Sequence, residues 1–127
     1  MTKSLEDYLE TIYVLIRDNK TARVRDVASM LDVKMPSVIK AVQELKSLGY
    51  VEQEPYGDIR LTSSGESAAN GILARHNLLT AFLAKLGVSA ENAEKDACLM
   101  EHILSAETID RIRAYVERSA KKERESK

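Results

Sequence analysis

Cysteine is nearly absent from this chain, since Cys98 is the only one. A lone cysteine excludes an internal disulfide, and chains without disulfides are typical of reducing compartments. No apolar run is long enough to cross a bilayer. The N-terminus, MTKSLEDYLE, also lacks the apolar stretch of a signal peptide. These absences predict a cytoplasmic protein that does not associate with membranes.

Aromatic residues are scarce as well, at 5% of the chain, with no Trp and one Phe. Leu, Ile, Val and Ala must therefore supply most of the core, which favours helices over a β-sandwich. The 127 residues suit one compact unit or two small, closely joined ones. The formal net charge of −1 gives no bulk preference for nucleic acid, so any DNA contact must come from a local group of basic residues.

The first half of the chain has the pattern of a winged helix-turn-helix. Apolar spacing and turn residues predict helices over 4–19, 24–31 and 36–48 and strands over 50–54 and 59–62. A short turn at residues 32–34 separates the second and third helices, and Pro36 suits the first turn of the third, where no N–H is required. The third helix is expected to bury Val38, Ile39, Val42 and Leu45. Three helices followed by a hairpin predict a DNA-binding domain over residues 1–62.

The third helix of such a domain lies in the major groove, so its outward side chains are candidates for DNA contact. Ser37 and Gln43 can hydrogen-bond base edges, and Lys40 can reach phosphate or guanine. Tyr56 and Arg60 in the hairpin can touch the backbone or the minor groove. The predicted DNA-binding residues are Lys34, Met35, Pro36, Ser37, Lys40, Gln43, Lys46, Tyr56 and Arg60. The alternative is that these are ordinary solvated residues of a small helical domain.

The second half is predicted to be all-helical, with helices over 63–86, 89–104 and 105–119. Ser89 and Ser105 are plausible N-caps, and Ser63 with Glu66 resembles a capping box. We expect a helical domain over 63–120 and a frayed, charged tail over 121–127.

Carboxylates form an unusual feature of the first helix. Asp7 and Glu10 point away from its main apolar face, and their i, i+3 spacing turns them the same way. The simpler interpretation is a solvated face, with Asp7 and Ser4 forming a capping box.

Metal-binding residue types recur in the second half. Cys98, Glu101 and His102 lie at i, i+3 and i+4, a spacing that places a thiolate, a carboxylate and an imidazole on one helical turn. The other, apolar face of this helix is expected to hold Leu99, Met100, Ile103 and Leu104. The alternative is a chance surface triplet. His76 lies on the apolar side of the long helix, where a lone histidine is more often a hydrogen-bonded core residue than a ligand.

Residues 6–13 (EDYLETIY), 61–65 (LTSSG), Arg75-His76 and 96–105 together resemble the diphtheria toxin repressor family of metal-dependent regulators. The resemblance extends from Leu5 to about Val116 and is strongest to the short manganese-transport-regulator branch. Longer relatives carry a third, barrel-like domain, for which this chain has no room. The resemblance implies a homodimer whose helices after Thr62 supply metal ligands and the dimer interface. It implies a metal-binding set of Asp7, Glu10, His76, Cys98, Glu101 and His102.

One position departs from the pattern of each branch. The manganese branch usually has Glu where this chain has Cys98, and the iron branch usually has Met where this chain has Asp7. Carboxylates suit Mn²⁺, whereas a thiolate favours Fe²⁺, Co²⁺ or Zn²⁺. We expect Mn²⁺ as the metal and Fe²⁺ as the alternative, with Co²⁺ or Zn²⁺ binding in vitro. The number of ions per subunit stays open.

The expected function is a repressor that binds palindromic, double-stranded operator DNA as a metal-loaded homodimer and controls metal-uptake genes. We expect no organic cofactor and no enzymatic activity. A winged-helix regulator of a small organic ligand is the main alternative, and it needs an apolar pocket. An enzyme using Cys98 as nucleophile and His102 as base lacks an evident oxyanion hole. A pure interaction module leaves the hairpin and the turn without a purpose.

Overall fold

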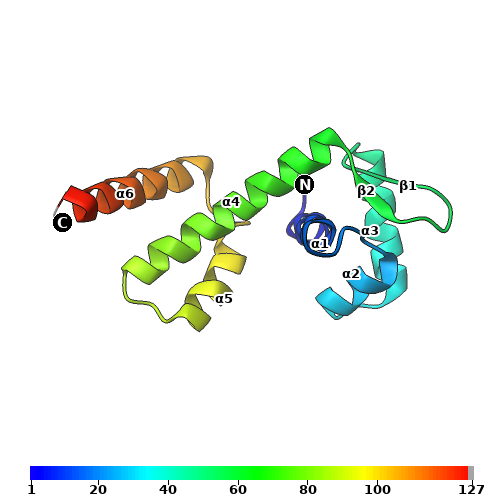
Figure 1. The fold of residues 1–127 in the computed structure, drawn as a ribbon, viewed down its shortest axis with the longest axis horizontal. Coiled ribbons are helices and arrows are strands. Elements are labelled where there is room, and N and C mark those ends of the chain that lie inside the picture. The colour runs from blue at the N-terminus through cyan, green and yellow to red at the C-terminus, as the bar shows by residue number, and fades with distance from the viewer. Residues whose placement is uncertain (126–127) are drawn as a thin grey trace. The chain divides into compact units, whose positions relative to one another are not determined.

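The structure, a computed structural model, describes residues 1–125 and contains six helices and one two-stranded sheet in that part of the chain (Figure 1). The elements are α1 (Lys3–Asn19), α2 (Val24–Leu31), α3 (Met35–Ser47), β1 (Val51–Gln53), β2 (Ile59–Leu61), α4 (Ser63–Lys85), α5 (Ala90–Met100) and α6 (Ala106–Glu125). The predicted mostly α-helical fold with a winged helix-turn-helix is confirmed. Within the described residues, no helix is both long and apolar enough to span a bilayer.

The chain packs as two compact units that divide between Ile72 and Leu73, inside α4. We call residues 1–72 unit 1 and the residues from Leu73 onward unit 2. The sequence predicted a division at Thr62 instead. The packing boundary lies later because Ala69 and Ile72 of α4 are buried in the same core as α1 and the hairpin.

The core of unit 1 is formed by the apolar faces of the first three helices and by inward residues of the hairpin. Helix α3 buries Val38, Ala41, Val42 and Leu45, which follow the three- and four-residue spacing of one helical face. Ile39 was predicted to join this face, and that prediction is wrong, because Ile39 is 46% exposed. Each step along a helix turns the side chain by about 100°, so the neighbour of buried Val38 points outward.

The hairpin is tied to the helices by a segment that sequence analysis did not identify. Strands β1 and β2 pair antiparallel, with Glu52 opposite Arg60. Ala22, between α1 and α2, forms a bridge with Ile59, whose N–H donates to the Ala22 carbonyl oxygen at 2.8 Å. Arg23 Nε also lies 3.1 Å from Asp58 Oδ1. The wing is therefore held against the helix-turn-helix by backbone and side-chain contacts within unit 1.

The start of α4 packs unusually close to the end of α3. Thr62 caps the helix by accepting from the Gly65 N–H at 3.0 Å, and its hydroxyl donates to the Gly49 carbonyl at 2.6 Å. The predicted Ser63 cap is thus displaced by one residue. A Cβ at Gly65 would lie 1.9 Å from the Tyr50 carbonyl oxygen, far inside van der Waals contact. Gly65 is required because only hydrogen fits there.

This close approach predicts opposite effects for two glycines of the same helix. Gly65→Ala should lower the free energy of unfolding by roughly 1–3 kcal/mol, because the methyl group must push a backbone carbonyl away. Gly71→Ala is the matched control, since nothing lies within 4 Å of its added Cβ. It should leave stability unchanged or raise it by up to about 1 kcal/mol through helix propensity. Urea denaturation measures both, and equal destabilisation of the two variants would contradict the packing described.

Unit 2 has a small core of Leu79, Leu83, Ala93, Ala97 and Ile109. Ser89 and Ser105 cap their helices as predicted, accepting from the N–H groups of the residues three positions later. Helix α5 ends at Met100 rather than at residue 104. Helix α6 continues to Glu125 rather than ending near Ser119, so the predicted frayed tail is helical through Glu125, and residues 126–127 lie outside the described residues.

The charged composition of the α6 end explains the longer helix. Lys, Arg and Glu have high helix propensity, so a run of charges does not by itself end a helix. Within unit 2, Lys85 Nζ of α4 also lies 3.2 Å from Glu123 Oε1 of α6. This exposed pair contributes little energy to the helix.

Candidate metal centre and nucleic-acid interface

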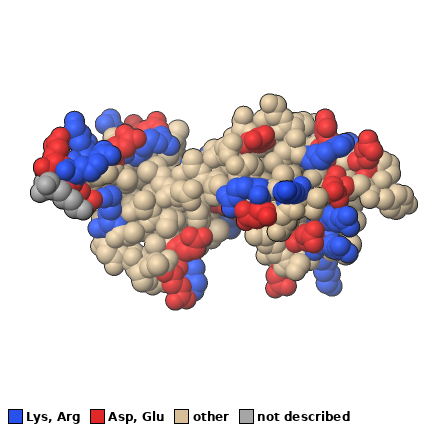
Figure 2. All heavy atoms as spheres, viewed as in Figure 1, with Lys and Arg blue, Asp and Glu red and all other residues tan. Residues whose placement is uncertain are grey.

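The predicted DNA-binding side chains all lie on the surface of unit 1. Exposed residues are Lys34, Met35, Pro36, Ser37, Lys40, Gln43, Lys46, Tyr56 and Arg60. The first seven lie on α3 or immediately before it, and the last two lie on the hairpin. On the face shown in Figure 2, basic and acidic side chains are interspersed, without one large region of a single sign. DNA contact therefore depends on the local arrangement around α3, as the net charge of −1 implied.

The turn between α2 and α3 has the geometry of a helix-turn-helix. Asp32 ends α2 in the left-handed conformation, with φ of 54°, and Lys34 precedes α3 in extended conformation. Pro36 occupies the first turn of α3, as predicted. Met35 and Ile39 are 48% and 46% exposed on this helix, so apolar side chains accompany the polar ones. Such side chains can contact a thymine methyl group, and Ile39 is a candidate that sequence analysis missed.

Two of the predicted contacts also have weak partners within unit 1. Lys46 Nζ lies 3.5 Å from the Gln53 carbonyl oxygen, and Arg60 Nη2 lies 4.0 Å from Glu54 Oε1. Both interactions are exposed and at the limit of contact distance, so either cation can exchange its partner for a phosphate at low cost. Tyr56, at the tip of the hairpin with φ of 61°, is fully exposed.

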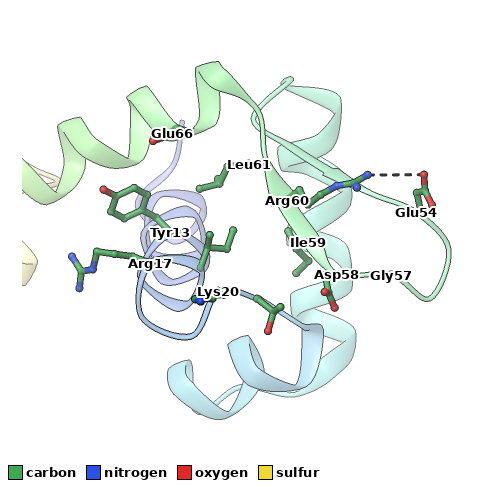
Figure 3. A pocket seen from close by; sticks show the side chains of 12 residues that line it. Tyr13, Arg17, Lys20, Glu54, Gly57, Asp58, Ile59, Arg60, Leu61 and Glu66 are labelled. Carbon is green, nitrogen blue, oxygen red and sulfur yellow. Dashed lines mark ion pairs between the residues drawn. The ribbon is translucent and has the colours of Figure 1, made fainter.

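A cavity of about 620 Å³ lies in unit 1 between the end of α1 and the wing (Figure 3). Ile59 and Leu61 point toward α1, whereas Arg60 points the other way, toward Glu54 (Figure 3). The rim is charged, and one of its members, Arg17, has a raised pKa because of its hydrogen bond to Asp18. Tyr13 is its one aromatic lining residue. The lining therefore combines apolar side chains of α1 and β2 with a charged rim.

The strongest candidate site lies inside unit 2, around Glu101. This carboxylate is 2% exposed and follows directly after the last residue of α5. One oxygen, Oε2, lies 3.0 Å from His76 Nδ1 of α4, and the other, Oε1, lies 3.1 Å from His102 Nε2. His76 is itself 8% exposed. Burying a carboxylate costs free energy unless positive charge or hydrogen bonds compensate it. The two imidazoles beside Glu101 supply such partners, which distinguishes this cluster from a group of solvated surface residues.

Glu101 and His102 follow directly after α5. Residues 101–103 form turns, and the backbone of Glu101 keeps right-handed helical angles. Glu101 follows Ala93 and Ala97 on the buried side of α5, at four-residue spacing. Cys98 is exposed. The common face of Cys98, Glu101 and His102 stays a prediction, as does the ligand role of each residue.

The chemistry of this cluster fits a divalent cation. Imidazole nitrogen and carboxylate oxygen are the usual protein ligands of Mn²⁺, Fe²⁺ and Zn²⁺. His76 Nδ1 is buried and has no hydrogen-bond partner among residues 1–125, although Glu101 Oε2 is only 3.0 Å away. A nitrogen and an oxygen that lie this close without an aligned hydrogen bond between them are well placed to bind one cation together.

The remaining predicted ligands are partly exposed. Asp7 and Glu10 of α1 are both half-buried. The N-cap of α1 is Thr2, whose side chain accepts from the Leu5 N–H, so the predicted capping box of Ser4 and Asp7 is wrong. Asp7 is thus not needed as a cap. The ligand roles of Asp7, Glu10 and Cys98 stay predictions.

Sequence analysis missed Glu94. Its Oε1 atom lies 2.9 Å from His76 Nε2, on the opposite side of the ring from Glu101. Glu94 lies four residues before Cys98 on the predicted helix, so helical spacing places both residues on the same side of it. This spacing could have identified Glu94 from the sequence.

A winged helix-turn-helix followed by a helical unit with a buried imidazole–carboxylate cluster defines a class of DNA-binding proteins with a metal-binding domain. Residues 1–59 match the family described as iron dependent repressor, N-terminal DNA binding domain. Residues 62–127 match iron dependent repressor, metal binding and dimerisation domain. The chain therefore belongs to the iron-dependent repressor family.

Individual relatives agree with this assignment. The chain is 44% identical over 111 residues to the HTH-type transcriptional regulator MntR of Geobacillus kaustophilus. The matched region covers 87% of this chain and 79% of that relative. Among solved structures, T. acidophilum IdeR is 32% identical with a TM-score of 0.74, over 91% of this chain and 53% of that one. A manganese-dependent transcriptional repressor in complex with manganese is 27% identical with a TM-score of 0.81, over 89% and 52%. The chain spans about half the length of these two solved chains.

Proposed function

We propose that this protein is a metal-dependent transcriptional repressor that binds palindromic operator DNA as a homodimer when loaded with Mn²⁺, and that it controls metal-uptake genes. The observation that carries the metal dependence is the buried Glu101 carboxylate, contacted by His76 Nδ1 and His102 Nε2 at 3.0 and 3.1 Å. The exposed polar face of α3 and the wing support the DNA-binding half of the proposal. Similarity to regulators named for manganese supports the choice of metal.

We propose that Asp7 and Glu10 of unit 1 join His76, Cys98, Glu101 and His102 of unit 2 as ligands. Without a cation, the carboxylates of such a set repel one another, which disfavours any arrangement that brings α1 to unit 2. A bound divalent ion supplies the positive charge that offsets this repulsion. The role of Asp7 and Glu10 is then to make the position of the DNA-binding unit depend on metal. A ligand that binds one arrangement better shifts the equilibrium toward it.

Dimerisation is the second requirement, since two recognition helices must match half-sites about 34 Å apart. Leu99 and Ile103 are 55% and 75% exposed, although sequence analysis placed both on an apolar face. Large exposed apolar side chains that lie close together in the sequence are typical of an interface. We propose that Leu99 and Ile103 contact a second copy of the chain. This surface follows Cys98 and flanks Glu101 and His102, so the ligands and the interface share one segment.

The choice of metal depends on Cys98. A thiolate ligand strengthens binding of Co²⁺ and Zn²⁺ more than that of Mn²⁺, because Mn²⁺ prefers oxygen ligands. We expect Cys98→Ser to lose roughly tenfold or more in affinity for Co²⁺ while its Mn²⁺ affinity changes little. The Co²⁺-loaded wild type should also show a sulfur-to-cobalt absorption band that the variant lacks.

Titration of wild type and Cys98→Ser with Mn²⁺ and Co²⁺, under reducing conditions, tests the proposal and this detail separately. Saturable Mn²⁺ binding to the wild type supports a metal-dependent regulator. A wild type that binds neither metal would overturn the proposed function. A wild type that binds Co²⁺ without the sulfur band would overturn only the ligand role of Cys98.

A further inference from the structure

Glu94 reaches the site from the surface of α5. Its side chain is 65% exposed, yet its Oε1 atom lies 2.9 Å from Nε2 of His76, whose side chain is only 10% exposed. The other ring nitrogen, Nδ1, lies 3.0 Å from Glu101 Oε2. The imidazole is therefore held between two carboxylates, one exposed and one buried.

The contact with Glu94 bears on which ring nitrogen of His76 carries the proton. An ionised carboxylate accepts hydrogen bonds and donates none. Nε2 is within hydrogen-bond distance of Glu94, whereas Nδ1 makes no hydrogen bond with Glu101 despite their 3.0 Å separation, so we assign the proton to Nε2. In a neutral imidazole the other nitrogen, Nδ1, then has the free lone pair. That atom is buried among the candidate ligands and makes no hydrogen bond within residues 1–125. The lone pair of His76 Nδ1 therefore faces Glu101, on the side of the ring where the proposed cation would bind.

We propose that Glu94 is a positioning residue for the metal centre, which selects the Nε2–H tautomer of His76 and holds Nδ1 toward Glu101. This inference rests on the proposed metal-dependent function. Carboxylates that orient a ligating histidine in this way contribute to metal affinity without touching the ion. Their removal typically costs about 10- to 100-fold in affinity.

Three variants of the full chain separate orientation from charge. Glu94→Ala removes both the carboxylate and the acceptor, whereas Glu94→Gln keeps an amide oxygen that can still accept from Nε2. Glu91→Ala is the matched control, because Glu91 is an exposed carboxylate of the same helix whose partner is Lys95, at 3.3 Å. We expect Mn²⁺ and Co²⁺ affinity to fall about 10- to 100-fold in Glu94→Ala. Glu94→Gln should lose much less, and Glu91→Ala should match the wild type.

The imidazole ¹⁵N chemical shifts of metal-free protein give a readout that does not depend on metal binding. The chain has two histidines, so a His102→Gln sample assigns both rings. We expect wild type and Glu94→Gln to show protonated Nε2 and unprotonated Nδ1 at His76, and Glu94→Ala to show a mixture of tautomers.

Two results would overturn the role of Glu94. One is a Glu94→Ala variant with wild-type shifts and wild-type metal affinity. The other is a Glu94→Gln variant that loses as much affinity as Glu94→Ala while its His76 tautomer is unchanged, which would assign the effect to charge alone. Absence of metal binding in the wild type would instead contradict the proposed function.

Discussion

His102→Ala and Glu10→Ala proteins are expected to bind operator DNA equally well with and without Mn²⁺. The wild type should gain roughly 5- to 150-fold in affinity when Mn²⁺ is added, which is the usual range of coupling between two binding sites. His102 contributes an imidazole beside the buried Glu101 carboxylate, at 3.1 Å. Glu10 contributes the proposed connection from α1. Removing either side chain should abolish the effect of Mn²⁺ on operator affinity, because neither residue is a predicted DNA contact.

The measurement is fluorescence anisotropy of operator DNA selected from a random-sequence pool by the Mn²⁺-loaded wild type. Circular dichroism and urea denaturation verify that each variant is folded. Asp18→Ala is the matched control for Glu10→Ala, since Asp18 lies on the same helix and pairs with the exposed Arg17. Its loss should leave the Mn²⁺ response unchanged. A full Mn²⁺ response in either ligand variant would show that our ligand assignment is wrong.

Leu99→Glu is expected to convert the dimer to a monomer and to weaken operator binding by about 100-fold or more. The glutamate would place a charge in an apolar contact, where its desolvation is not compensated. Two linked recognition helices bind two half-sites with an avidity gain of about 10²–10⁴, which a monomer lacks. Sedimentation velocity with and without Mn²⁺ measures the oligomeric state, and anisotropy measures the affinity.

Met30→Glu is the control for this prediction, because Met30 is 54% exposed and lies on α2, outside the dimerisation domain. The control protein should stay dimeric. Ile103→Glu, on the same proposed surface, should behave like Leu99→Glu. A Leu99→Glu protein that sediments as a dimer would place the interface elsewhere on the chain.

Helical periodicity was sufficient to locate the helices but not to place their ends. The apolar spacing of α3 and α4 reflects burial along the whole element, and this signal survives in the sequence. Helix ends depend on which groups satisfy a few backbone N–H and C=O groups. Thr62 caps α4 because its hydroxyl also reaches the Gly49 carbonyl, a contact between residues distant in sequence. Spacing rules do not include such contacts.

The sequence was sufficient to identify the residues of the candidate site but not how they are arranged in space. His76, Glu101 and His102 were identified, and the structure brings all three together. Helix α5 ends at Met100 rather than at residue 104, so the sequence pattern also misplaced the end of the helix that precedes His102. Glu94 was missed because its partner, His76, belongs to another helix. A contact between residues of two helices depends on how the helices of unit 2 pack. The apolar pattern of a single helix does not carry that information.

The central claim is that a divalent ion controls DNA binding, and its most direct test compares wild-type protein with and without Mn²⁺ on the selected operator. Anisotropy titrations at one fixed salt concentration, with chelator in the metal-free arm, measure both dissociation constants. We predict tighter binding by roughly 5- to 150-fold with Mn²⁺. Equal dissociation constants in the two arms would contradict the account.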